Sequence, residues 1–194
     1  MALPKTHTIA ACALSLSLAL MGGLAACGAD HSDLGVDEPA REGLAVDIGG
    51  LDYNVFITRE LNLAVTPDKD LYDGPPAEPG HTLYGVFVLV CNTGGDAVRS
   101  ADVADFVVKD NQDNEFEPIE LPEDNAFAYQ PQELGDQECI PEAGSVAQQG
   151  PTAGSMLLFD FPLENTENRP LELEVTSPAT SDRESETKRF FLDL

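Results

Sequence analysis

The chain has 194 residues, with 35 acidic side chains against 10 basic ones and a formal net charge of −25. A surface so negative repels nucleic acid and anionic lipid headgroups, which excludes both as partners. Tryptophan is absent and only three histidines are present, so the chain offers few side chains for catalysis. The length suits one domain and a short leader.

The first 26 residues have the parts of a secretory signal. Lys5 is the only charged side chain before Cys27, and an apolar run covers residues 9–20. Such a run is long enough for a signal peptide but short for a membrane span. The run ends at Leu24-Ala25-Ala26-Cys27, which resembles the lipobox of bacterial lipoproteins. We therefore expect cleavage between Ala26 and Cys27. The alternatives are an ordinary signal peptide, in which Cys27 is incidental, and a retained membrane helix.

The lipobox resemblance implies a lipid on Cys27. In lipoproteins, a diacylglyceryl group is linked to this sulfur as a thioether, with acyl chains such as palmitate. Two acyl chains anchor a protein stably, whereas one gives only marginal binding. We therefore expect the mature protein to be attached to the cell membrane through Cys27 and to face the outside of the cytoplasm. Which membrane and which leaflet remain open.

The four cysteines divide cleanly. Cys12 is lost with the leader and Cys27 takes the lipid, which leaves Cys91 and Cys139. An even pair outside the cytoplasm predicts a disulfide bond. Two free buried thiols are the alternative. A metal site is disfavoured, because no C-x-x-C motif and no nearby histidine accompany the pair.

The mature chain divides into a tether and a domain. Residues 27–42 are small, polar and acidic with no sustained period, so we expect a lipidated flexible tether after the signal peptide of residues 1–26. Residues 43–194 alternate with a period of two, which is typical of strands. The predicted strands cover residues 51–61, 82–91, 103–109, 115–119, 154–163, 171–175 and 188–194.

These strands predict an all-β fold. Residues 82–91 are almost wholly apolar, as in a central strand covered on both faces, while 171–175 alternate Leu and Glu as in a half-exposed strand. Residues 103–119 read as a hairpin with a polar tip at 110–114. Long connections are expected at 66–80 and 120–151. About seven to eight short strands separated by turns predict an antiparallel β-sandwich.

Several motifs resemble one group of bacterial envelope lipoproteins. They are Pro79-Gly80, V-F-V-L-V-C-N-T-G at 86–94, F-V-V-K-D-N-Q-D-N-E-F-E-P at 106–118, and G-S-M-L-L-F-D-F-P at 154–162. The group carries an immunoglobulin-like domain of unknown function and is similar to the secreted immunogenic protein family of mycobacteria. The resemblance covers about residues 50–178 and implies an immunoglobulin-like sandwich. It implies no activity, and Asp113-Asn114 at the hairpin tip departs from the usual Asp-Gly.

Two patterns in the sequence involve residue types that can form chemical sites. Asp110, Asp113 and Glu115 are candidate calcium ligands, but an EF-hand register that starts at Asp110 puts Glu115 where glycine is required. We therefore predict a hairpin turn here, with a cation site as the alternative. No G-x-S-x-G motif surrounds a serine, and His81 is the only candidate base in the domain.

The sequence thus predicts a non-catalytic, lipid-anchored binding domain at the bacterial cell envelope. The loops near 66–80 and 120–150 are expected to carry recognition, because loops on a rigid sandwich commonly do so. The partner is expected to be an envelope protein or a small ligand, and no cofactor is expected. Two alternatives stay open: a cation- or solute-binding lipoprotein that serves a transporter, and an envelope hydrolase.

Overall fold

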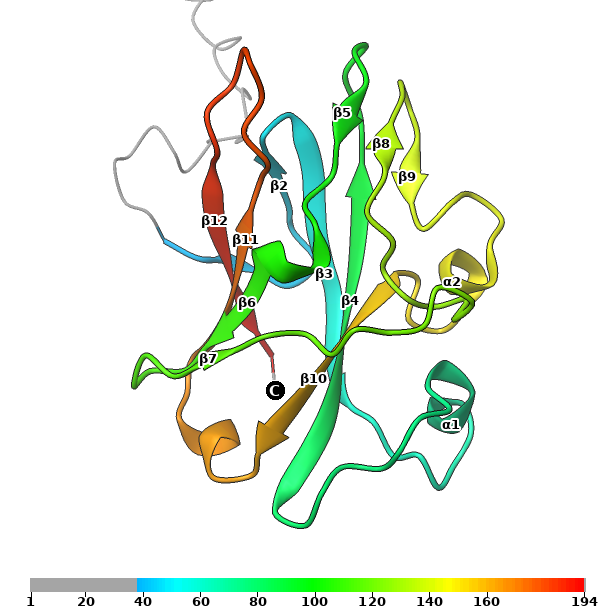
Figure 1. Cartoon of the computed structure of the whole chain (residues 1–194), viewed down its shortest axis with the longest axis vertical. Coiled ribbons are helices and arrows are strands. Elements are labelled where there is room, and N and C mark those ends of the chain that lie inside the picture. The colour runs from blue at the N-terminus through cyan, green and yellow to red at the C-terminus, as the bar shows by residue number, and fades with distance from the viewer. Residues whose placement is uncertain (1–37, 194) are drawn as a thin grey trace, which may run out of the picture. The chain divides into compact units, whose positions relative to one another are not determined.

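The computed structural model describes residues 38–193, which form an all-β domain with a few single-turn helices (Figure 1). The predicted leader, the cleavage site at Ala26 and Cys27, and most of the predicted tether lie outside these residues. The strands are β1 (Ala40–Arg41), β2 (Ala45–Ile48), β3 (Leu51–Glu60), β4 (His81–Cys91), β5 (Val98–Arg99), β6 (Phe106–Lys109), β7 (Glu115–Phe116), β8 (Glu133–Leu134), β9 (Cys139–Ile140), β10 (Ser155–Pro162), β11 (Leu171–Thr176) and β12 (Thr187–Leu192). The helices are α1 (Asp68–Leu71), η2 (Val103–Asp105), α2 (Val146–Gln149) and η3 (Asn165–Glu167).

Two sheets form an immunoglobulin-like antiparallel sandwich, which confirms the predicted fold class. One sheet has the order β1-β12-β11-β6-β7, and the second has the order β10-β4-β3-β2, with β9 also paired to β4. Strands β5 and β8 make a separate two-stranded sheet. All pairings are antiparallel except that of β1 with β12. The predicted strands correspond to β3, β4, β6, β7, β10, β11 and β12, and the additional strands have only two to four residues. Two predictions were too long, because residues 103–105 form η2 ahead of β6, and β7 ends at Phe116.

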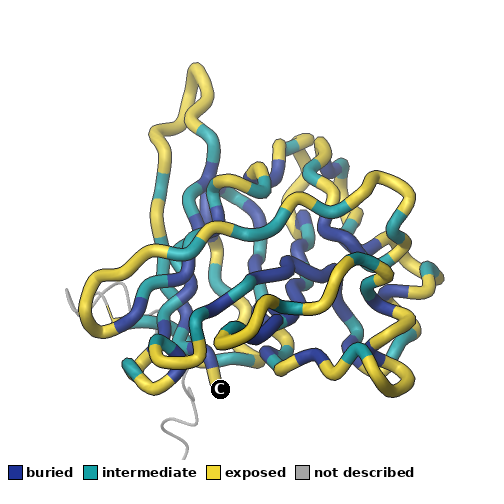
Figure 2. The backbone as a smooth tube through the Cα atoms, turned by 60° about the horizontal axis from the view of Figure 1, so that its bottom comes forward, coloured by how far each residue is buried: buried dark blue, intermediate teal, exposed yellow. Residues whose placement is uncertain are grey.

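The main core lies between the two sheets. Alternate residues of β4 and β10 point inward and meet the inner faces of β6, β11 and β12. Figure 2 shows the buried residues gathered in the interior of the domain and the exposed residues in the outer loops. Aromatic rings are packed together within it: Phe159 and Phe161 stack with centroids 5.7 Å apart, and Tyr129 meets Phe106 edge to face at 5.0 Å. Each fully buried side chain of this size contributes about 1.5–3 kcal/mol through the hydrophobic effect.

A second core covers the opposite face of the second sheet. Leu83 and Phe87 of β4 and Met156 and Leu158 of β10 are buried there against the connections that cross this face. Strand β4 is therefore enclosed on both faces, as its apolar sequence predicts. Strand β11 shows the opposite case, because its leucines are buried while Glu172 forms an ion pair with Arg189 on the exposed face, 2.9 Å away.

A β-bulge in β3 changes one predicted face. The alternation of residues 51–61 predicts that Tyr53, Val55 and Ile57 share one side, but the register with β4 shifts between Val55 and Ile57. Phe56 occupies the bulge and is 46% exposed. Ile57 consequently packs against the second core, and Thr58 takes the inward position. A bulge adds one residue to one strand, and sequence alternation alone does not reveal it.

The folded domain begins earlier than the predicted boundary at residue 43. Ala40 and Arg41 form β1, which pairs in parallel with β12. The Glu42 carboxylate accepts hydrogen bonds from the backbone N–H of Thr58 (3.2 Å) and of Asp193 (3.0 Å). The last residues assigned to the tether are thus part of the sandwich. A two-residue strand is too short to show a period of two in the sequence.

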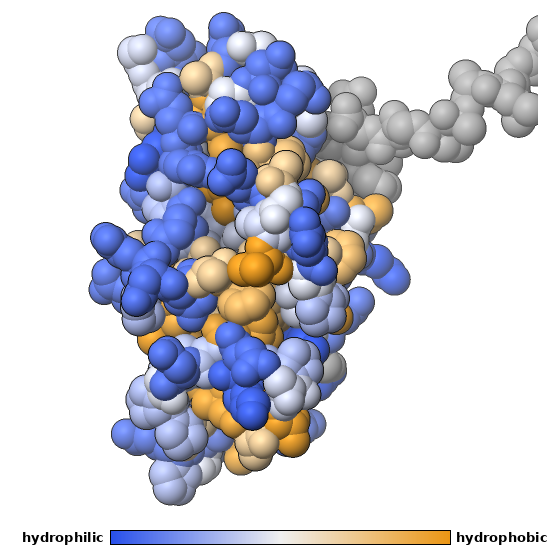
Figure 3. All heavy atoms as spheres, turned by 90° about the vertical axis from the view of Figure 1, so that its right-hand side faces the viewer, coloured by the Kyte–Doolittle hydropathy of each residue, from blue (hydrophilic) through white to orange (hydrophobic). Residues whose placement is uncertain are grey.

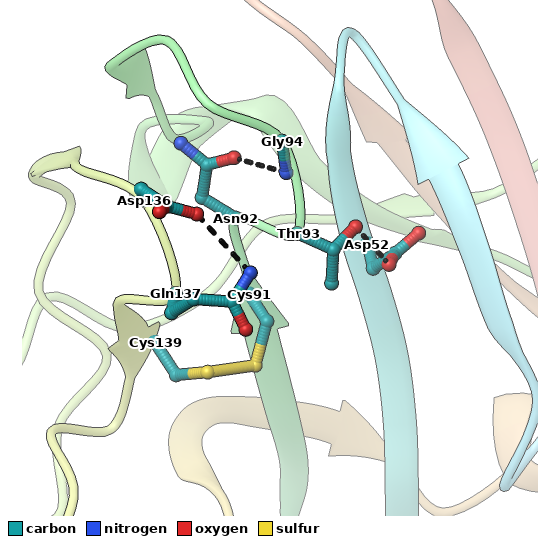
Figure 4. The surroundings of a disulfide bond; sticks show 8 residues. All are labelled: Asp52, Cys91, Asn92, Thr93, Gly94, Asp136, Gln137 and Cys139. Carbon is teal, nitrogen blue, oxygen red and sulfur yellow. Dashed lines mark hydrogen bonds between the residues drawn. A yellow bond between two sulfur atoms is a disulfide. The ribbon is translucent and has the colours of Figure 1, made fainter.

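The predicted disulfide between Cys91 and Cys139 is present and joins β4 to β9 (Figure 4). Beside it, the buried side chain of Asn92 donates to the carbonyl oxygens of Asp96 (2.7 Å) and Leu134 (2.9 Å) and accepts from the N–H of Gly94. The disulfide and this amide together fasten the long connection between β7 and β10 to the end of β4.

Replacing both cysteines (Cys91→Ser with Cys139→Ser) should lower the free energy of unfolding by about 4 kcal/mol, because the bond closes a loop with a sequence separation of 48 residues. Denaturant titration followed by circular dichroism measures the loss. Reductant should produce the same loss in the unmodified protein and none in the double variant. An unfolding free energy unchanged by the double substitution would contradict this account.

Candidate binding face on the second sheet

Two long connections cover the outer face of the second sheet. One runs from the end of β3 through α1 to β4, and the other runs from β7 towards β10. Figure 3 shows apolar side chains gathered in the middle of the molecular face that carries α1 and α2, with hydrophilic side chains around them. Two apolar residues are exposed at these helices: Val65, just before α1, and Val146, the first residue of α2. The loops predicted to carry recognition therefore build one surface.

A buried ion pair holds the first connection in place. The Asp68 carboxylate is only 3% exposed; one of its oxygens pairs with the Arg59 guanidinium. The other oxygen accepts the backbone N–H of Asn62 at 2.9 Å. A buried carboxylate is tolerated when both oxygens are satisfied in this way. The connection is thereby fixed to the end of β3 before any ligand arrives.

The second connection is fixed to β10 and to the first connection. The N–H of Ile119 donates to the Leu158 carbonyl at 2.6 Å, and the N–H of Tyr129 donates to the Met156 carbonyl at 2.9 Å. The Asn125 side chain donates to the Leu71 carbonyl at 3.0 Å. The two connections are therefore linked by a hydrogen bond and form a continuous, preorganised surface.

Two tyrosine hydroxyls anchor the loop that follows β5. The Tyr53 hydroxyl accepts the N–H of Ala101 at 2.8 Å, and the Tyr129 hydroxyl donates to the Ala101 carbonyl at 2.9 Å. Burial raises the pKa of Tyr53 to about 12, although the hydrogen bond from Ala101 lowers it in part. Burial also raises the pKa of Tyr129. Both phenols therefore stay neutral at physiological pH and serve as structural hydrogen-bonding groups.

Two hollows lie at the margins of this surface. The first, which we call the edge groove, has a volume of about 270 Å³ and lies beside β10. It is lined by Val103, Ile119, Glu120, Leu121, Glu123, Tyr129, Gln130, Pro131, Met156 and Leu157. The second, which we call the loop hollow, has a volume of about 520 Å³. It is lined by Glu60, Leu61, Asn62, Leu63, Ala64, Pro76, Ala77, His81, Thr82 and Leu83.

His81 lines the loop hollow and is held by a carboxylate. Its Nδ1 lies 3.0 Å from the Asp160 carboxylate. The hydroxyl of neighbouring Thr82 donates to Glu60 at 2.8 Å and is therefore engaged away from the imidazole. Two serines that each follow a glycine also have structural positions, because Ser145 caps α2 and Ser155 is buried in β10. The hydrogen bonds of these residues do not form the nucleophile–base pair that covalent catalysis uses.

The candidate calcium ligands are separated in the structure. Asp110 is 5% exposed, Asp113 lies at the turn with a positive φ of 63°, and Glu115 pairs with Lys109 at 2.9 Å. The Asp110 carboxylate instead accepts the side-chain amides of Asn114 (2.8 Å), Asn168 (2.9 Å) and Asn165 (3.1 Å). Within residues 38–193 no group of three or more His, Cys, Asp or Glu side chains is arranged to hold a metal ion.

The amide cage sets the charge state of Asp110. Burial alone would raise the pKa of this carboxyl, but the hydrogen bonds from Asn114, Asn168 and Asn165 outweigh burial and hold the pKa well below its usual range. The ionised carboxylate therefore joins the β6–β7 hairpin to the η3 turn. Asn165 and Asn168 lie far from Asp110 in sequence, and only the fold brings them to its carboxylate.

Comparison with known proteins adds little beyond the fold. No family model and no curated protein sequence matches the chain. The protein yjhA of Bacillus subtilis is 11% identical, with a TM-score of 0.45 over 79% of this chain and 99% of its own. The ycdA protein of Bacillus subtilis subsp. subtilis str. 168, provisionally described as a lipoprotein, is 18% identical, with a TM-score of 0.45 over 76% of this chain and 38% of its own.

An uncharacterised β-sandwich protein of Clostridium difficile 630 is 16% identical, with a TM-score of 0.45 over 79% of this chain and 95% of its own. These similarities are of β-sandwich folds and carry no argument about activity. The expected kinship with the mycobacterial secreted immunogenic protein family finds no support in a family model or a sequence match.

Replacing the caged carboxylate (Asp110→Asn) should lower the free energy of unfolding at neutral pH by about 2–3 kcal/mol, because hydrogen bonds to a charged acceptor are lost. It should also flatten the acid dependence of stability. The unfolded carboxyl takes up a proton near about pH 4 while the folded one resists, so the unfolded state binds more protons and stability falls as pH drops through this range.

Denaturant titrations between neutral and acidic pH measure both effects. The exposed neighbour provides a matched control: Asp113→Asn removes the same charge from the same turn and should retain the acid dependence of the unmodified protein. Equal pH dependence in the Asp110 variant and the unmodified protein would rule out the caged carboxylate as the cause.

Proposed function

We propose that this chain is a lipid-anchored, non-catalytic binding module that works outside the cytoplasm, at the surface of a bacterial cell membrane. The observation that carries the proposal is the preorganised surface over the second sheet. Its two long connections are fixed by a buried ion pair, by backbone hydrogen bonds to β10 and by a disulfide. Long loops that are held rigidly on a β-sandwich suit recognition, because little entropy is lost when they bind.

The sequence at Cys27 supports the anchor. Leucine and two alanines precede the cysteine after an apolar run with a single upstream lysine, which is the pattern of lipoprotein maturation. Two acyl chains on the sulfur would hold the protein at the bilayer by burial of hydrocarbon. Among the described residues, the structure has no helix of the length and apolarity that a membrane crossing needs.

The choice of binding over catalysis rests on the groups near the hollows. His81 is held by Asp160, and the nearby hydroxyl of Thr82 is engaged with Glu60. Ligand sites in proteins are concave, with an apolar lining and a few polar groups that fix orientation. Both hollows are lined by apolar and polar groups together; the edge groove lies beside β10, and the loop hollow lies where the first connection leaves β3 and enters β4.

Metabolic labelling tests the anchor. In a bacterial host fed an alkyne analogue of palmitate, the unmodified chain should incorporate the label, and mass spectrometry should find a diacylglyceryl group on Cys27. The variant Cys27→Ser should lose the label, because serine cannot form the thioether. The matched control Cys12→Ser should keep it. Label that persists after Cys27→Ser, or an unmodified Cys27 in the parent chain, would refute the anchor.

Site-specific photocrosslinking tests the binding surface. A photoreactive amino acid at Val65 or Val146, both exposed on the proposed surface, should give a reproducible covalent adduct with one envelope component in intact cells. The same amino acid at Thr187, which is exposed on β12 of the other sheet, serves as the control and should not give that adduct. An identical adduct pattern at all three positions would argue against a dedicated binding surface.

A further inference from the structure

We propose that the edge groove binds an extended, basic segment of a partner protein by receiving lysine or arginine side chains. The inference rests on the binding role proposed above and names the chemical class of the partner. It depends on three properties of the groove: its size, its apolar walls and two carboxylates that form no ion pair with a basic residue of the described range 38–193.

The size of the groove suits side chains rather than a whole small molecule. Its volume is about 270 Å³, slightly below the usual range of about 300–1,000 Å³ for pockets that enclose drug-sized ligands. Ile119 and Leu121 from the second connection, Met156 and Leu157 from β10, and Val103 from η2 form most of its walls. The aliphatic stem of a long side chain can therefore lie against apolar surface along the groove.

The charge of the groove selects a cation. Glu120 and Glu123 are both exposed and are the only charged residues in its lining. No lysine or arginine occurs between Lys109 and Arg169, the stretch that supplies most of the groove. Lys109 is itself shared between Glu115 (2.9 Å) and Glu174 (2.8 Å). A cation that pairs with Glu120 and Glu123 would therefore come from another molecule.

Another basic side chain, Arg99, is engaged with Asp102 at 2.9 Å. A partner side chain would therefore meet an acidic rim that the protein's own cations do not compensate. Lysine and arginine match such a site, because their stems cover apolar surface while their charged heads stay at the rim. A divalent metal ion does not match it, because it requires a shell of closely spaced oxygen ligands.

The backbone edge of β10 beside the groove is already occupied by the second connection. At this edge the chain already accepts extended backbone, through the hydrogen bonds of Ile119 to Leu158 and of Tyr129 to Met156. Between these two points residues 120–126 leave the edge and the groove opens beside them, while the Phe127 carbonyl accepts the N–H of Met156 at 2.6 Å. Because these backbone groups of Met156 and Leu158 are already paired, a partner segment would add no strand here and would enter the groove through its side chains.

Fluorescence anisotropy with the full chain in detergent micelles tests the proposal. The probes are labelled hexalysine and a hexamer of diaminobutyric acid, which carries the same number of amines on stems that are two methylenes shorter. Hexalysine should bind more tightly by about fourfold or more, because each buried methylene contributes about that factor. Unlabelled spermine, as competitor, distinguishes a small amine from a peptide.

The decisive variant removes both groove carboxylates, Glu120→Gln with Glu123→Gln. Its affinity for hexalysine should fall by about fivefold to tenfold at low ionic strength, which is the effect expected for two solvent-exposed ion pairs. The control is Glu164→Gln with Glu184→Gln, which changes the net charge equally at two exposed positions away from the groove. Its affinity should stay within about twofold, and both variants should keep the thermal stability of the parent.

Four results would overturn the proposal. Equal weakening by the two double variants would show that hexalysine is attracted by overall acidity. Equal affinity for the two hexamers would show that the apolar walls do not take part, and spermine competing as strongly as hexalysine would assign the groove to small amines. A failure of hexalysine binding, with Cys27 lipidated and the adducts at Val65 and Val146 intact, would remove the partner class and leave the binding module standing.

Discussion

The burial of β4 on both faces is the constraint on which the rest of this structure depends. One face of the strand packs into the core between the sheets, and the other packs under the long connections. A strand with two apolar faces is stable only when both are covered, so the connections that cross the second sheet are structural parts of the domain. The binding face that we propose is therefore the outer surface of a core layer, which explains how loops of this length stay in place.

The same arrangement decides where charge can lie. The apolar residues fill the core between the sheets and the second core under the connections. The acidic side chains therefore lie on the open face of the first sheet and on the connections. On the open face they alternate with basic residues, as in the pairs of Lys109 with Glu174 and of Arg189 with Glu172. The second connection has no basic residue to pair with its glutamates. The domain is thus electrostatically uneven, compensated over one sheet and uncompensated at the edge of the other.

The sequence predicted what depends on local pattern and missed what depends on distant partners. The apolar run at 82–91 predicts a strand buried on both faces, and the Leu–Glu alternation at 171–175 predicts a strand with one buried face. The structure confirms both. The disulfide followed from counting cysteines. The ion pair of Arg59 with Asp68 and the tyrosine hydroxyls at Ala101 had no such signal, because an ordinary charged or aromatic residue acquires its role only when the fold supplies a partner. The bulge at Phe56 was hidden for a related reason, since one extra residue in a strand leaves the composition unchanged.

The short parallel strand β1 determines how the domain responds to a pull on its N-terminal side. Ala40 and Arg41 pair with Phe190 and Phe191 of β12. The Glu42 carboxylate accepts one hydrogen bond from Thr58 and one from Asp193. Mechanical load from that side reaches these few bonds before it reaches either core layer. These few bonds are separate from those that hold the two connections over the second sheet, so the entry of the chain into the domain and the recognition surface depend on different contacts.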